Sequence, residues 1–198
     1  GASTMKMEHL FKKSLLAAGA AALLAACGTP SPEEAAPESS LADQQHGMLA
    51  SCDPVELAEV AEHACVHSDF GPFEPVTAAA LGAPVFVDVS APHTAYVITL
   101  PSHPVQGWAG RVAYIPEESG EFAFLVSRYR GLRIYDAATG VEVARECRYN
   151  VPSNVCGSLK TGIVADLEGG VEYHLEFKAT AERNSTFTLL VEEAGHEH

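Results

Sequence analysis

Basic residues are scarce in this chain. It contains 12 Lys and Arg against 26 Asp and Glu, which gives a formal net charge of −14. Proteins that bind nucleic acid need cations to neutralise phosphates, so this balance argues against nucleic acid as a partner. A strongly acidic surface instead favours solubility and raises the local concentration of cations.

The start of the chain lacks a hydrophobic run long enough to cross a bilayer. The apolar stretch 14–26 is shorter than the roughly 20 residues that a spanning helix needs. It follows a short basic segment containing Lys6, Lys12 and Lys13, an order typical of a secretory signal peptide. We therefore predict a signal peptide over residues 1–26, of which residues 1–4 precede the first methionine and are left out of the fold prediction.

The predicted signal peptide ends in Leu24-Ala25-Ala26-Cys27-Gly28, which resembles the lipobox of bacterial lipoproteins. The resemblance implies cleavage before Cys27, acylation of its sulfur and anchoring to a membrane through lipid. Gly28 fits the usual outer-membrane sorting signal, so the expected location is the outer membrane, facing the periplasm or the cell surface. The alternative is an ordinary secretory peptide with a cysteine nearby.

The segment after Cys27 has no aromatic residue between 29 and 45 and contains one leucine. It cannot bury enough apolar surface to fold, so residues 27–50 are predicted to be a lipidated, disordered tether. Residues 1–26 carry a net charge of +2, and without them the chain has about −16. Beyond the tether we predict a helix with a Cys/His exit segment over 51–75, and a β domain with a His-containing tail over 76–198.

A helix start is predicted at Asp53-Pro54-Val55-Glu56. Asp is a favoured cap, Pro is tolerated at the first helical position, and Glu56 stands three residues after the cap. Apolar residues then follow at helical spacing: Leu57, Val60, Ala61 and Ala64. The helix is expected to end near His67 and must stop by Gly71-Pro72.

After Pro75 the period of the hydrophobic pattern changes from 3.6 to 2. The candidate strands are 85–89, 94–100, 111–115, 121–127, 132–135, 141–145, 162–166, 171–178 and 185–192. Short strands separated by turns predict an all-β fold. We expect a jelly roll or β-sandwich of about eight to nine short antiparallel strands, preceded by one N-terminal α-helix.

Segments of this β region share aromatic strands, glycines and a Leu-x-Ile-Tyr-Asp motif. They are Tyr96-Val97-Ile98-Thr99-Leu100, Gly110-Arg111-Val112-Ala113-Tyr114-Ile115, Gly120-Glu121-Phe122-Ala123-Phe124, Leu132-Arg133-Ile134-Tyr135-Asp136-Ala137 and Gly170-Val171-Glu172-Tyr173-His174-Leu175. With this pattern, residues 94–192 resemble the bacterial pre-peptidase C-terminal (PPC-like) β-sandwich. The resemblance implies a sandwich that serves as a binding or secretion module, although no peptidase accompanies it here. The long 147–156 loop also departs from the usual short hairpin.

Four cysteines remain after Cys27, and an exported protein can keep disulfides. Cys147 and Cys156 flank a polar loop and form the preferred bridge. A continuous helix would hold Cys52 and Cys65 about 20 Å apart, which is too far for a disulfide. Two alternatives stay open: Cys65 is a free or metal-bound thiol, or Cys52 and Cys65 pair with the loop cysteines.

Metal-ligating residues crowd together only in residues 62–73. His63 and His67 share one helical face, whereas Cys65 and His67 converge only if the chain has left the helix. We favour Cys65 with His67, because residues 68–72 predict an irregular exit. A thiolate with an imidazole suits copper(I) or zinc.

Further ligands are expected from His63, or from His196 and His198 in the tail; His174 is another candidate. The remaining histidines of the tether and loops are predicted to be ordinary surface residues: His46, His93 and His103.

Motifs of familiar hydrolases and electron carriers are missing. The chain has no Gly-x-Ser-x-Gly elbow, no His-Glu-x-x-His zinc helix and no Cys-His-Met copper loop. We therefore predict no enzymatic activity. Trp108, in a loop between predicted strands, could contact a partner, or it could cover one end of the sandwich.

Two functions follow from these observations. The first is an outer-membrane-anchored periplasmic lipoprotein that binds copper or zinc through the Cys-x-His site. The alternative is a non-enzymatic adhesion or scaffolding module that binds a protein or glycan, in which the cysteines are structural.

Overall fold

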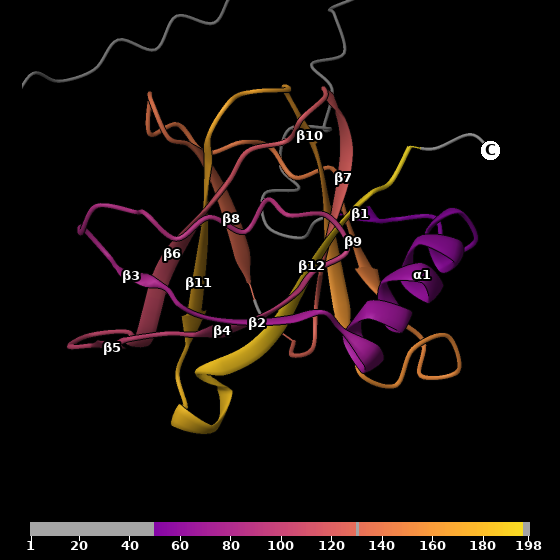
Figure 1. Ribbon diagram of the computed structural model, residues 1–198, viewed down its shortest axis with the longest axis horizontal. Helices are drawn as coiled ribbons and strands as arrows, with labels where there is room; N and C mark the ends of the chain where they lie inside the picture. The colour runs from indigo at the N-terminus through magenta and orange to yellow at the C-terminus, as the bar shows by residue number, and fades with distance from the viewer. Residues whose placement is uncertain (1–49, 130, 196–198) are drawn as a thin grey trace, which may run out of the picture. The chain divides into compact units, whose positions relative to one another are not determined.

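Two β-sheets pack face to face in the computed structural model, which describes residues 50–129 and 131–195 (Figure 1). In spatial order the larger sheet contains β1 (Ala50–Ser51), β9 (Cys147–Asn150), β10 (Thr161–Leu167), β7 (Gly120–Val126), β12 (Thr186–Glu193), β4 (Ala95–Thr99) and β2 (Phe73–Thr77). The smaller sheet contains β3 (Ala79–Ala80), β6 (Gly107–Tyr114), β11 (Tyr173–Ala179) and β8 (Leu132–Asp136), with β5 (Ser102–His103) paired to β6. The described helices are α1 (Glu56–Phe70) and the short 3-10 helix η2 (Glu182–Asn184). The predicted all-β sandwich with one α-helix is confirmed for these residues.

Most neighbouring strands are antiparallel, but β1 pairs with β9 and β2 pairs with β4 in parallel. Both parallel strands flank α1 in the chain, and neither was predicted. Each lies at an edge of the larger sheet, and together they fix both ends of the helical segment to that sheet.

The main core lies between the two sheets. Alternate residues of each strand point into it, as Tyr173, Leu175 and Phe177 of β11 do. Their partners from the larger sheet include Phe124, Ile98 and Leu189, which are fully buried. This period-2 pattern is the one that the sequence predicted.

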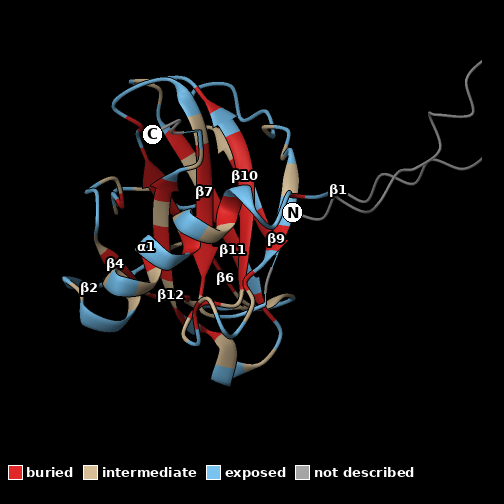
Figure 2. Ribbon diagram, turned by 90° about the vertical axis from the view of Figure 1, so that its right-hand side faces the viewer, coloured by how far each residue is buried: buried red, intermediate tan, exposed pale blue. Residues whose placement is uncertain are grey.

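A second core lies between α1 and the outer face of the larger sheet (Figure 2). Leu57, Ala61 and Ala64 of α1 pack there against residues that include Leu125 and Leu190. As a result β7 and β12 are buried on both faces over much of their length, and their sequences read as nearly continuous apolar runs. The small alanine side chains allow the helix to lie close to the sheet.

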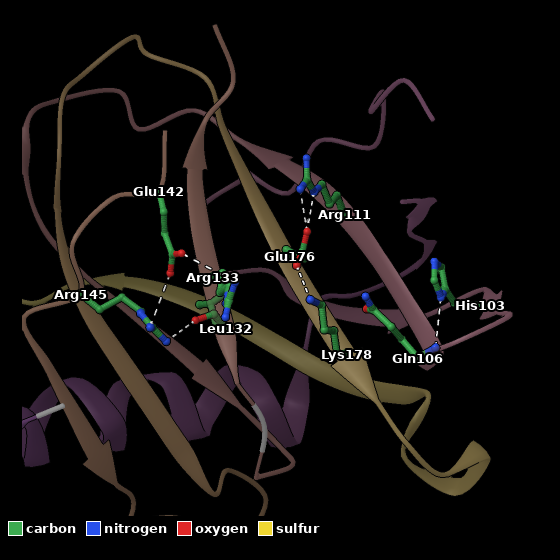
Figure 3. A network of polar contacts seen from close by, with 9 residues as sticks. All are labelled: His103, Gln106, Arg111, Leu132, Arg133, Glu142, Arg145, Glu176 and Lys178. Carbon is green, nitrogen blue, oxygen red and sulfur yellow. Dashed lines mark hydrogen bonds and ion pairs between the residues drawn. The ribbon is translucent and has the colours of Figure 1, made fainter. Parts of the chain in front are cut away.

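The outer face of the smaller sheet carries charged side chains instead (Figure 3). Glu176 of β11 is only 5% exposed and accepts hydrogen bonds from Arg111 Nε and Nη2, at 2.9 and 2.7 Å. Lys178 lies 2.9 Å from its other carboxylate oxygen. Although Glu176 stands on the outer face of β11, its two cationic neighbours cover it.

Several element boundaries differ from the prediction. α1 continues past His67 to Phe70 and ends at Gly71, whose φ of 80° favours glycine. It begins at Glu56, three residues after the predicted cap, although Asp53 Oδ1 still accepts the amide hydrogen of Val55.

The predicted strands at 85–89 and 141–145 are reduced to isolated bridges, Asp88 with Ala113 and Tyr135 with Glu142. The short strands β1, β2, β3, β5 and β9 were not predicted. None of the described helices is both long enough and apolar enough to cross a membrane.

Candidate metal centre

Three histidines meet beside the helix. His63 and His67 lie one turn apart on α1, and His93 comes from the loop that leads into β4. One ring nitrogen of each lies within 4.8 Å of the others, and each pair of ring centroids is 5.0 Å apart. Three imidazoles arranged in this way could hold one transition-metal ion.

Hydrogen bonds orient the two helical rings. His63 Nδ1 lies 3.2 Å from Glu192 Oε2, and His67 Nδ1 lies 3.2 Å from the carbonyl oxygen of Gly71. A carboxylate and a carbonyl both accept, so in each ring Nδ1–H is the donor, and in the neutral tautomer Nε2 keeps its lone pair. This arrangement is the usual one around metal-binding histidines in proteins.

Glu192 is a buried acid, 9% exposed, on the outer face of β12 beneath α1. Burial raises its pKa, and the neighbouring rings of His63, His93 and His67 oppose part of that rise. Its second oxygen, Oε1, has no hydrogen-bond partner among the described residues. The site thus places a buried carboxyl group directly behind one imidazole.

The topology explains how His93 reaches the helix. α1 ends at Gly71, and β2 begins two residues later and pairs in parallel with β4, with Phe73 opposite Ala95. The amide of Ala95 also donates to the carbonyl of Pro72. The start of β4 therefore lies beside the C-terminal end of α1. His93 itself has φ 54°, a left-handed conformation that is uncommon outside glycine.

A pocket of about 540 Å³ adjoins the histidines. His63 and His93 both line it, as do residues from the end of α1 that begins at Glu56 and from the end of β12. It has five acidic side chains, and we name it the acidic pocket: Glu56, Glu59, Glu117, Glu192 and Glu193. Burial, together with the charges of Glu193, Glu192 and Glu117, raises the pKa of Tyr114, which also lines it. An ion held by the histidines would have this pocket on one side.

Both of the preferred roles for the cysteines are wrong. Cys65 is bonded to Cys156 and Cys52 to Cys147, so the predicted Cys147–Cys156 bridge does not form. Cys65 is therefore no thiolate ligand, and the Cys-x-His site is not present. The pairing of Cys52 and Cys65 with the loop cysteines, the alternative left open, is the one observed.

The physical reason lies in the elements around the cysteines. β1 pairs with β9 so that Ala50 is opposite Cys147, and the amide of Cys52 donates to Arg148. The helix remains intact through Cys65 and turns that side chain towards the sheet, into the second core with Cys156. Because the helix does not break, His67 pairs with His63 at one-turn spacing.

Other predicted site residues lie elsewhere. His174 is on β11 of the smaller sheet, with Nε2 3.2 Å from Glu172 Oε1. Trp108 belongs to β6 rather than to a loop, and it is half-buried against the main core. This packing favours its role as a cover, and a partner contact stays a prediction. The lipidation site Cys27 and the tail histidines His196 and His198 lie outside the described residues.

Sequence reasoning missed His93 and Glu192. His93 was interpreted as an ordinary loop residue, because it is 26 positions beyond His67 and no motif joins them. Glu192 carried a signal: it stands two positions after the buried Leu190, on the same face of β12. A carboxylate in that register needs a nearby partner, which is His63.

No protein-family model matches this chain, and no curated protein is significantly similar to it in sequence.

Proposed function

We propose that this protein binds a transition-metal ion, zinc(II) or copper(II), through His63, His67 and His93. The observation that supports this most directly is the approach of three ring nitrogens to within 4.8 Å of one another. Tetrahedral zinc with Zn–N bonds of about 2.0–2.1 Å needs ligand nitrogens roughly 3.3 Å apart, so small ring rotations would complete the site.

The hydrogen bonds at Nδ1 add to this support. In the neutral rings of His63 and His67 they place the proton on Nδ1, and the unprotonated Nε2 is then the atom that can bind a metal. The negative charge of Glu192 would strengthen His63 as a ligand. Since the cysteines are oxidised, the donor set consists of imidazoles, and this favours zinc(II) or copper(II) over copper(I).

Three protein ligands leave at least one coordination position open. Structural zinc sites usually have four protein ligands, while sites that exchange ligands or metal keep a position free. We therefore propose a role in metal capture or handling. The predicted lipid at Cys27 would place this role at the outer membrane, in the periplasm or on the cell surface.

The direct test is zinc titration of untagged protein that retains β1, measured by isothermal titration calorimetry. We expect one zinc ion to bind, and we expect His67→Ala or His93→Ala to weaken binding by about 100-fold or more. His103→Ala and His174→Ala are matched controls that should leave affinity unchanged. Equal affinity in the wild type and in both site variants would contradict the proposal.

A second variant tests the tail. If His196 and His198 supply ligands, replacing both with Ala will weaken zinc binding, and copper(II) binding with it. If they do not, affinity will depend on the three described histidines alone.

The scaffolding alternative keeps one supporting observation, because both disulfides have the structural role that it assumed. It expects no metal in protein purified without a tag. Elemental analysis of such protein separates the two functions.

A further inference from the structure

We infer that the acidic pocket binds a small organic cation, one that carries an ammonium or guanidinium group and a donor atom for the metal ion. The inference rests on the proposed metal site and adds the class of ligand that the site would receive. Its basis is the hollow beside the histidines and the charges that surround it.

The pocket and the metal site share residues. His63 and His93 line the hollow while also belonging to the histidine cluster. A metal ion bound by these rings would therefore have its open coordination position near the pocket. The volume, about 540 Å³, lies within the range of small-molecule sites.

Two acidic residues of α1, Glu56 and Glu59, precede His63 on the helix and line the pocket. Glu59 precedes His63 by four residues and Glu56 precedes it by seven, so all three lie near one face of the helix. At a rise of 1.5 Å per residue, the backbone positions of Glu59 and Glu56 lie about 6 and about 10 Å from that of His63 along the helix axis. A ligand with its donor at the metal would thus have its far end among carboxylates.

The other walls have the same sign of charge. Glu117 and Glu192 come from two further segments of the chain. Glu192 is buried, with Oε2 3.2 Å from His63 Nδ1, and its other oxygen, Oε1, has no hydrogen-bond partner among the described residues. None of the described residues that line the pocket is a Lys or Arg. Anionic ligands are therefore disfavoured, and a cation is attracted.

Apolar side chains complete the pocket between the charges. They include Val60, Ile115, Phe122 and Val191. A short alkyl chain between donor and cation would contact these groups. The ligand class is thus an amine or guanidine with a hydrocarbon spacer of a few carbons and a nitrogen donor.

The test uses a matched pair of probes, 1-(3-aminopropyl)imidazole and 1-propylimidazole. Both offer the same imidazole nitrogen to a metal, but only the first carries an ammonium group. Zinc binding to the protein is measured first, and each probe is then titrated into the zinc-loaded protein. We expect the amine probe to bind about fivefold more tightly or better, with the preference falling at high salt.

Variants identify the source of this preference. Glu59→Gln with Glu117→Gln should remove most of it, because both side chains are exposed and line the pocket. Glu62→Gln with Glu168→Gln removes the same two charges from exposed positions that do not line the pocket, and it should leave the preference intact. Circular dichroism confirms that each variant is folded.

The outcomes separate the two proposals. If zinc does not bind to the wild type, the proposed function fails and this inference fails with it. If zinc binds but the two probes bind equally, the metal site stands and the inference is overturned. Equal binding of the amine probe to metal-free and zinc-loaded protein would also overturn it, because the metal would then contribute nothing.

Discussion

At the scale of single residues, Glu192 is a buried acid that contacts one of the three clustered histidines. It stands on β12 beside the half-buried Val191 and two positions after the buried Leu190, and its one described hydrogen bond is to His63. A carboxylate that accepts from Nδ1–H fixes the ring and increases the basicity of Nε2. We therefore treat Glu192 as a residue that positions His63.

Glu192→Gln is expected to weaken zinc binding by about tenfold, since a neutral amide still accepts from Nδ1–H but provides no charge. Zinc titration by calorimetry measures this change. Glu62→Gln is the matched control, because Glu62 is the exposed neighbour of His63 on α1. Equal losses in the two variants would show that overall charge, rather than the bond to His63, determines affinity.

At the scale of elements, the smaller sheet is joined across its outer face by ion pairs. Glu176 on the central strand β11 connects to Arg111 on β6, and Arg111 also lies 4.7 Å from the ring centroid of Tyr135 on β8. Burial raises the pKa of Glu176, but the hydrogen bonds from Lys178 and Arg111 outweigh it, and the pKa lies below its usual value. The charged form is therefore the one that stabilises the fold.

The lowered pKa of Glu176 predicts how the stability of the protein changes with pH. A carboxyl whose pKa is lower in the folded state stabilises the protein above its unfolded pKa, and the contribution is lost as pH falls through the folded pKa. Glu176→Gln should lower the free energy of unfolding by about 1–3 kcal/mol at pH 7. The difference from the wild type should shrink below about pH 4.5.

Urea unfolding at several pH values between 7 and 3 measures this difference. The exposed Glu168→Gln serves as the control, and its stability should follow the wild type across the range. A deficit of Glu176→Gln that stays constant down to pH 3 would show that the charge of Glu176 is not responsible.

At the scale of the whole molecule, two disulfides join distant parts of the chain. Cys52–Cys147 spans 95 residues and Cys65–Cys156 spans 91. Both hold the helical segment to the β9–β10 region of the larger sheet. Bridges that close loops of this length restrict the unfolded chain strongly.

Removing either bridge with paired Cys→Ser changes should lower the free energy of unfolding by about 2–5 kcal/mol. Cys65 lies between two of the histidines, so loss of Cys65–Cys156 should also weaken zinc binding more than loss of Cys52–Cys147. Urea unfolding and zinc titration of both double variants provide the comparison. Equal zinc affinities would contradict a link between this bridge and the site.

The sandwich and its helix could be predicted because their signals are local. The alternation in β11 and the helical spacing from Leu57 to Ala64 each lie within one segment. The histidine cluster could be predicted only in part. His63 and His67 share a helix, whereas His93 joins them through the parallel pairing of β2 with β4, which no short pattern encodes.

The prediction of a Cys147–Cys156 bridge was wrong for a related reason. Loop length favoured the nearest partners, Cys147 and Cys156, on grounds of chain entropy. The pairing of β1 with β9, the pairing of β9 with β10 and the packing of α1 bring each loop cysteine to a cysteine of the helical segment instead. These are tertiary contacts, which the local sequence does not encode.

The link between α1 and β2 has a consequence for how such proteins could diverge. Only Gly71 and Pro72 separate the last helical residue from the first residue of β2. Adding one residue to the helix here would turn its preceding positions by about 100° relative to the strand, and His67 would no longer face His93. Chains that share this centre should therefore preserve the length of the link even where their sequences have drifted beyond detectable similarity.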